Sequence, residues 1–276
     1  MKLVTVNDGT TISEESYRAD LAYSASDLKK LIAENPFSLW NQKHNPEGPL
    51  LKFPESSVFR MGRAVHASVL EPNEYHSRYG FVPDRRTKEG KAEAARLQAE
   101  GKTVLNPTEW QLVQEISGAV ARHPLAGPLF NQGKAEQSIW WDHQTSGLTC
   151  KCRCDWINDS NQIIDLKTTG EGGASPKAFA NSIGKFSYHL QAAHYMQGVM
   201  ATDFIFVVVE KAWPYNIGVY RLDQEALDEG LELQQVALHT IADCIEKETW
   251  PDYNNGKIQT LELPGYYQYR SVGAQP

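Results

Sequence analysis

The stretch DWINDSNQIIDLK, residues 155–167, decides how the rest of the sequence is interpreted. Two runs with strand character flank the turn-forming segment 159–161. Residues i and i+2 of a strand share a face, so Asp165 and Lys167 point the same way. A three-residue loop at 159–161 sets Asp155 opposite Asp165 in an antiparallel pair, where opposed β-carbons lie about 4.5–5.5 Å apart. The stretch therefore predicts a β-hairpin that brings two carboxylates and one ammonium group together.

This predicted grouping has a specific chemistry. Two carboxylates that close repel each other unless a cation lies between them or one is protonated. Mg²⁺ prefers oxygen ligands, and two ions about 3.5–4 Å apart can stabilise the attacking and leaving oxygens of a phosphodiester. Lys167 would orient a water or offset phosphate charge. The alternative is a hairpin with ordinary surface charges, because D-x-K alone is common by chance.

Two helical patterns extend the predicted site. Gly62 and His66 are i and i+4 on one helix face, where glycine permits close approach to the sheet and His66 can add a metal ligand. Gln191 and Tyr195 have the same spacing, and an amide and a phenol so placed can hold a phosphate or the lysine. The alternatives are a packed histidine and a half-buried polar pair.

Periodicity and turn residues predict an α/β fold: a central mixed sheet with helices on both faces. Strands are expected within 135–168, at 203–211 and at 215–221. Helices are expected near 57–70, within 84–102, near 175–183, 188–200 and 223–247, and another after a capping box of Thr108 and Gln111. We expect one domain over residues 1–276, with a helical and irregular N-terminal extension (1–56, irregular up to 22), a core (57–250) and a C-terminal tail (251–276).

Composition narrows the function classes. The 276 residues are 41% hydrophobic, which excludes wholesale disorder, and no apolar run has the ~18 residues of a membrane span. The net charge of −7 argues mildly against a protein that coats nucleic acid. No secretory signal is evident at the N-terminus, and a cytoplasmic location is expected.

The ordered set G-x-x-x-H, Asp, D-x-K and Q-x-x-x-Y resembles the RecB-type branch of the PD-(D/E)xK nucleases, and within it the exonuclease VIII (RecE) type of nuclease domain. The resemblance covers roughly residues 20–250. The segments that carry it are YSASDL (23–28), FRMGRAVH (59–66), DRRTKEGK (84–91) and DLKTT (165–169).

The resemblance implies a role for each matching residue. Its implied metal ligands are His66, Asp155, Asp165 and the main-chain carbonyl of Leu166. It implies that Lys167 assists the attacking water and that Gln191 and Tyr195 support the site and the scissile strand. Glu136 is a further acidic candidate, with a surface carboxylate as an equal alternative.

The resemblance also implies an activity. The expected enzyme is a Mg²⁺-dependent exonuclease on double-stranded DNA ends, with Mn²⁺ as a substitute ion, working 5′ to 3′ and leaving 3′ single-stranded tails. The implied setting is phage-type recombination with a single-strand annealing protein, and the implied assembly is a homo-oligomer, in its tetrameric form a ring whose channel holds the basic groups. Alternatives are an endonuclease or single-strand nuclease of the same fold, or an inert DNA-binding or assembly module.

A basic cluster and a set of cysteines each allow more than one interpretation. The candidates for DNA contact are Arg63, Arg85, Arg86 and Lys88. The alternative is that the basic residues simply face solvent at the start of a helix. Cys150, Cys152 and Cys154 alternate on one strand, with Cys244 distant, a poor cage for an iron–sulfur cluster, so none is expected. No ATP use is expected, because no G-x₄-G-K-[ST] occurs.

Overall fold

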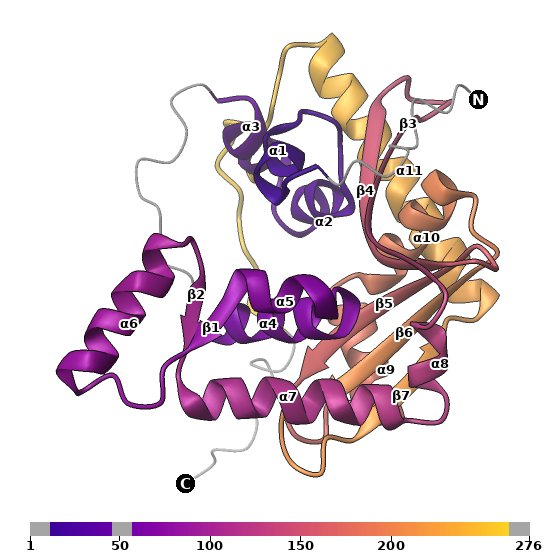
Figure 1. Cartoon of the computed structure of the whole chain (residues 1–276). Helices are drawn as coiled ribbons and strands as arrows, with labels where there is room; N and C mark the ends of the chain where they lie inside the picture. The colour runs from indigo at the N-terminus through magenta and orange to yellow at the C-terminus, as the bar shows by residue number, and fades with distance from the viewer. Residues whose placement is uncertain (1–11, 46–56, 265–276) are drawn as a thin grey trace, which may run out of the picture.

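A five-stranded mixed sheet forms the centre of the chain (Figure 1). The structure is a computed structural model and describes residues 12–45 and 57–264. Strand order is β3-β4-β5-β6-β7, with β5 and β6 parallel and the other neighbours antiparallel. The strands are β3 (Gly133–Asp142), β4 (Thr149–Asn158), β5 (Gln162–Thr169), β6 (Asp203–Glu210) and β7 (Ile217–Arg221). The predicted mixed sheet is confirmed.

Helices cover both faces of this sheet. One face packs around Cys152, Phe206 and Leu238, and the other around Ile164, Val207 and Ile116. The first is covered by α2 (Ala25–Ala33), α9 (Pro176–Lys185), α10 (Tyr188–Val199) and α11 (Gln224–Glu246). The second is covered by α4 (Ser57–Leu70) and α7 (Pro107–Arg122), both visible on the near side of Figure 1. The sheet is therefore the middle layer of three, as predicted.

The remaining elements lie around these layers. β1 and β2 form a short parallel pair, and α6 projects with them from the body at the left of Figure 1. Val82, Leu97 and Val104 form a separate small core beneath α6. These elements are α1 (Glu14–Ala19), α3 (Pro36–Lys43), α5 (Pro72–Arg78), β1 (Tyr79–Phe81), α6 (Lys88–Ala99), β2 (Thr103–Leu105) and α8 (Ala126–Leu129).

Two local predictions were wrong. Part of the region expected to be irregular is the helix α1, whose N-cap Ser13 accepts a bond from the Ser16 amide. The capping box of α7 is Asn106 with Glu109, not Thr108 with Gln111. Pro107 decides this position, because proline lacks an N–H and fits the first helical turn, which makes the residue before it the cap.

Parts of the expected extension and tail, residues 1–11, 46–56 and 265–276, lie outside the described residues. The single-domain division therefore stays a prediction. Within 12–45 and 57–264, no helix combines the length and the apolar character needed to cross a membrane.

Candidate active site

The β4–β5 hairpin places Asp155 beside β5, through the predicted three-residue loop. Asn161 closes that loop in the left-handed region at φ 57°. The ladder pairs Ile157 with Ile163 and Trp156 with Ile164, and stops there. The next position in this register would set Asp155 opposite Asp165. At this position the Asp155 side chain replaces the backbone as the hydrogen-bond acceptor: its Oδ2 accepts a 2.8 Å hydrogen bond from the Leu166 amide.

An irregularity in the sheet accompanies this change. Cys150, Cys152 and Cys154 all pack into one core, but Trp156 packs on the opposite face, so side-chain alternation shifts at Asp155. On β3, Glu136 has φ 51° and is skipped by the ladder between its neighbours. Asp155 is the residue skipped on the other strand, so the register is the same on both sides of the interruption. Asp155 faces away from the cysteine core by ordinary alternation, and the break lies between it and Trp156.

Asp165 and Lys167 share a face of β5, as predicted, and form an ion pair between Asp165 Oδ2 and Lys167 Nζ. The Asp165 side chain is 3% exposed. Its Oδ1 accepts a 2.8 Å hydrogen bond from Nε2 of Gln191 on α10. Its Oδ2 has the Lys167 contact but no hydrogen bond of good geometry. One oxygen of this buried carboxylate is thus held firmly, and the other faces the site.

His66 reaches the site from α4. Its Nδ1 lies 3.6 Å from Asp155 Oδ2. Gly62, one turn earlier, lies over β5, where an added β-carbon would stand 3.6 Å from Thr168 Oγ1. That is an ordinary van der Waals distance, so the expected steric need for glycine is not evident. The helix still carries His66 to the hairpin acids.

The electrostatics of the group follow from burial and mutual charge. Burial, together with the negative charge of Asp165, raises the pKa of Asp155 to about 7. Burial would lower the pKa of Lys167, but the two carboxylates outweigh it and raise that pKa above its usual value. Burial and the Lys167 charge lower the pKa of His66. The site thus favours a charged ammonium at Lys167 and a neutral imidazole at His66, and it disfavours ionisation of Asp155.

The other predicted acidic and phenolic members lie at the margins of this group. Tyr195 packs on the sheet, with its ring 6.3 Å from that of Phe204 between centroids. Glu136 pairs with Arg153, at 2.7 Å between Oε2 and Nε. Burial and the nearby charge of Asp155 raise the pKa of Glu136. Gln191 therefore touches Asp165 directly, whereas Glu136 and Asp155 interact through their charges.

Two residues of this neighbourhood were not predicted. Lys29 of α2 donates a 3.1 Å hydrogen bond from Nζ to Gln191 Oε1. The Tyr188 ring lies beneath both lysines, with its centroid 5.0 Å from Lys29 Nζ and 4.7 Å from Lys167 Nζ. Burial and the Lys167 charge lower the pKa of Lys29 to about 7. The helical spacing of Tyr188 and Gln191 could have indicated Tyr188, but no sequence signal points to Lys29.

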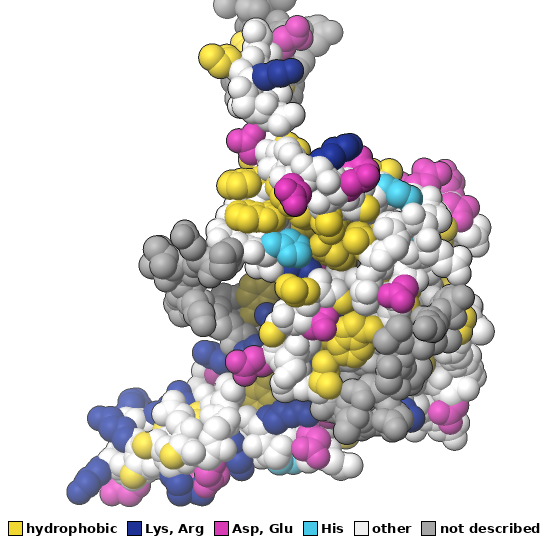
Figure 2. Space-filling view, turned by 90° about the horizontal axis from the view of Figure 1, so that it is seen from above, with side chains coloured by type: hydrophobic (Ala, Val, Ile, Leu, Met, Phe, Trp, Pro, Cys, Tyr) yellow, Lys and Arg dark blue, Asp and Glu magenta, His cyan; other side chains and the backbone are white. Residues whose placement is uncertain are grey.

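The four basic candidates do not form one cluster. Arg63, on α4, lies 3.9 Å from Glu14 between Nη1 and Oε2. The others lie on the projection with α6: Arg85 donates to the Val104 carbonyl at 2.9 Å, Arg86 pairs with Asp84 at 3.0 Å, and Lys88 is exposed at the start of the helix. Figure 2 shows Lys and Arg side chains gathered on this projection, at its lower left.

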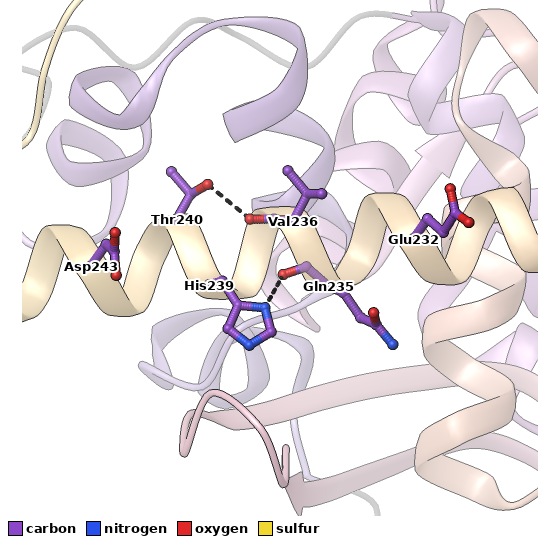
Figure 3. A pocket seen from close by; sticks show the side chains of 6 residues that line it. All are labelled: Glu232, Gln235, Val236, His239, Thr240 and Asp243. Carbon is purple, nitrogen blue, oxygen red and sulfur yellow. Dashed lines mark hydrogen bonds between the residues drawn. The ribbon is translucent and has the colours of Figure 1, made fainter.

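A surface groove along α11 is a competing location for a site, and its polar groups do not converge (Figure 3). His239 Nδ1 lies 2.8 Å from the carbonyl of Gln235, and the Thr240 hydroxyl donates to that of Val236, also at 2.8 Å. Both groups are thus satisfied within their own helix. The hairpin acids, which meet side chains from two helices, α4 and α10, are the stronger candidate.

The donor set suits a hard divalent cation, although it is not arranged as a finished cage. In the part of the chain that the structure describes, no three His, Cys, Asp or Glu side chains converge as metal ligands. Lys167 contacts the Asp165 oxygen that a cation would share, and the fourth predicted ligand is a main-chain carbonyl. Two carboxylates, a carbonyl and an imidazole match the ligand preferences of Mg²⁺ or Mn²⁺. Asp165 Oδ2 has its ion pair with Lys167 and no further partner, so a second lone pair is available to a cation.

A model of the PDDEXK-like domain of unknown function, DUF3799, matches residues 24–264. The chain belongs to the DUF3799 family. The segment matched by the DUF3799 model contains the hairpin, α4 and α10, and therefore every residue of the candidate site. No curated protein matches the chain.

Solved structures resemble this DUF3799 chain at low sequence identity. A protein described as a candidate exonuclease from Eubacterium rectale has a TM-score of 0.61 and 13% identity, covering 98% of this chain and 99% of that one. A phage-related exonuclease from Haemophilus somnus 129PT has a TM-score of 0.36 and 14% identity, covering 83% and 96%. The first of these likenesses shows a shared fold, and the PDDEXK-like α/β fold expected from the sequence is confirmed.

Proposed function

We propose that the chain is a divalent-metal-dependent deoxyribonuclease that hydrolyses phosphodiester bonds, and more narrowly an exonuclease on duplex DNA ends. One observation carries the proposal: Asp155, Asp165 and Lys167 meet at the splayed end of the β4–β5 hairpin, under His66. The PDDEXK-like fold supports it, as does the likeness to the Eubacterium rectale protein, which is described as a candidate exonuclease.

The residues would divide the work as follows. Asp155, Asp165 and the Leu166 carbonyl would hold the cation, with His66 as an added ligand on the Asp155 side. A bound divalent ion supplies charge to the phosphate and lowers the pKa of a coordinated water. Gln191 would keep Asp165 in place through its 2.8 Å hydrogen bond. Tyr195 would support the same face of α10 through its packing on the sheet.

Lys167 would act on the reacting water. Its ammonium group can donate to the attacking oxygen or to a non-bridging phosphate oxygen while it keeps contact with Asp165. The water oxygen forms the new bond to phosphorus, one ester bond to a sugar oxygen breaks, and that oxygen takes a proton. The 4.7 Å contact with the Tyr188 ring would restrict the lysine side chain to this position.

The finer assignment rests on the resemblance to exonuclease VIII nuclease domains. It includes Mg²⁺ as the working ion, 5′ to 3′ digestion that leaves 3′ tails, a tetrameric ring and a single-strand annealing partner in phage-type recombination. A ring would place basic groups toward DNA and acidic groups outward, consistent with a net charge of −7. Arg85, Arg86 and Lys88 on the α6 projection would then contact phosphates.

A nuclease assay on labelled DNA tests this proposal. Linear duplex labelled at the 5′ or the 3′ end, and covalently closed circles, are incubated with and without Mg²⁺. We expect Mg²⁺-dependent loss of label from the linear duplex with the circles intact, and no cleavage by Asp165→Ala. Digestion of the circles would support the endonuclease alternative instead. Mg²⁺-dependent activity retained in Asp165→Ala would remove the proposed site.

A further inference from the structure

Lys29 lies next to the candidate site because the helix that carries it, α2, is anchored in the core. The N-terminus of α2 is fixed by a capping box between Ser24 and Asp27, and Leu28 is fully buried in the core. This anchoring carries the Lys29 side chain along α10, where its ammonium reaches Gln191 at 3.1 Å. The position of Lys29 is thus set by helix packing.

The partner of this ammonium is unusual for a partly buried charge. Lys29 donates to a neutral amide and lies over an aromatic ring, with the ammonium of Lys167 near the same ring. Repulsion between two partly desolvated cations disfavours this arrangement for stability. A role in the site explains why a lysine occupies the position.

The Gln191 amide connects Lys29 to the acids. In its protonated form Lys29 can only donate, so Gln191 Oε1 faces it, and Nε2 then faces Asp165 Oδ1 at 2.8 Å. A cation at the amide oxygen polarises the amide and strengthens its donation at the nitrogen. Asp165 thereby has Oδ1 held while Oδ2 remains turned to Lys167.

We propose that Lys29 is a positioning residue of the candidate active site: its ammonium holds and polarises the Gln191 amide, which in turn aims Asp165. This inference rests on the proposed nuclease function for its kinetic consequences. Lys29→Met removes the ammonium but keeps a stem of similar length over Tyr188. We expect kcat to fall roughly tenfold, with KM changed less than about twofold, because a charge-assisted hydrogen bond outside the substrate contact is lost. Lys29→Arg should restore most of kcat.

A double-mutant cycle separates this role from direct substrate contact. If Lys29 acts through Gln191, Lys29→Met in a Gln191→Ala background lowers kcat by less than about twofold further. Independent, multiplying losses would overturn the proposal. Lys30→Met is the matched control, since Lys30 is adjacent on α2 and pairs with Glu34 on the surface at 2.9 Å. It should leave kcat unchanged.

A readout without catalysis keeps this test apart from the proposed function. The side-chain amide signals of Gln191, assigned by their loss in Gln191→Ala, are recorded by NMR. We expect Lys29→Met to change the chemical shifts of these amide signals from their wild-type values. We expect Lys30→Met to leave the chemical shifts unchanged. Unchanged signals in a folded Lys29→Met protein would overturn the proposal even if the wild type cleaves DNA. Shifted signals in a protein that cleaves nothing would refute the nuclease assignment alone.

Discussion

The carboxylate of Asp155 should destabilise the metal-free protein, so replacing it with asparagine should stabilise the fold. Asp155 stands beside Asp165 with its side chain 19% exposed, and its pKa is raised from 3.8 to about 7. The folded chain therefore binds a proton at Asp155 more tightly than the unfolded chain does. The contribution to stability is complete below about pH 4, is lost as the pH rises toward 7 and then stays level.

The size of the effect follows from the pKa shift. A rise of about three pH units corresponds to about 4 kcal/mol at high pH. Part of this is returned in Asp155→Asn, because Lys167 loses one of the two carboxylates that attract it. The asparagine oxygen can keep the 2.8 Å bond from the Leu166 amide. We therefore expect a net gain of about 2 kcal/mol at pH 8 in EDTA.

Denaturant unfolding in EDTA at several pH values measures this gain. Asp155→Asn should be the more stable protein at pH 8, with the difference shrinking toward pH 4. Asp159→Asn, in the exposed loop of the same hairpin, is the matched control and should change little. Added Mn²⁺ should stabilise the wild type but not Asp155→Asn. An Asp155→Asn protein equal to or less stable than wild type at pH 8 would refute the reasoning.

Changes at the catalytic lysine, the basic projection and the buried cysteines test other parts of the molecule. Lys167→Met should lower kcat at least about 100-fold in a single-turnover cleavage assay, since a positioned donor to the reacting group is lost; activity within tenfold of wild type would count against the role. Replacing both Arg86 and Lys88 with alanine should reduce the slope of log K for duplex binding against log salt concentration by roughly one unit per lost phosphate contact. An unchanged slope would show that the projection does not contact DNA. Cys152→Ala should lower the unfolding temperature without changing kcat, because its thiol is buried in the core, and joint loss of bound iron and activity would instead indicate a cluster.

The parts of the site that the sequence could predict are those governed by local rules. The loop at 159–161, the shared face of Asp165 and Lys167 and the helix that carries His66 all follow from period and turn chemistry. The pairing register was also predictable, because a three-residue loop fixes which residues oppose each other. These features need no information about distant parts of the chain.

The parts that could not be predicted depend on tertiary packing. The splay at Asp155 arises because its own carboxylate replaces a ladder bond to Leu166, which no pattern of apolar residues encodes. Lys29 is far from Gln191 in sequence, and only the docking of α2 on α10 brings them together. The left-handed backbone at position 136 could not be predicted either, because the residue there is a glutamate and not a glycine or an asparagine.

The central claim is that the hairpin acids hold a divalent cation for phosphodiester hydrolysis. Crystals of the wild-type protein soaked in Mn²⁺ and measured at a wavelength where manganese scatters anomalously test it most directly. We expect an anomalous peak bounded by Asp155, Asp165 and the Leu166 carbonyl, with the His66 ring beside it, and no such peak in Asp165→Ala crystals. A wild-type map with no peak at these atoms, or with its manganese bound elsewhere, would contradict the account.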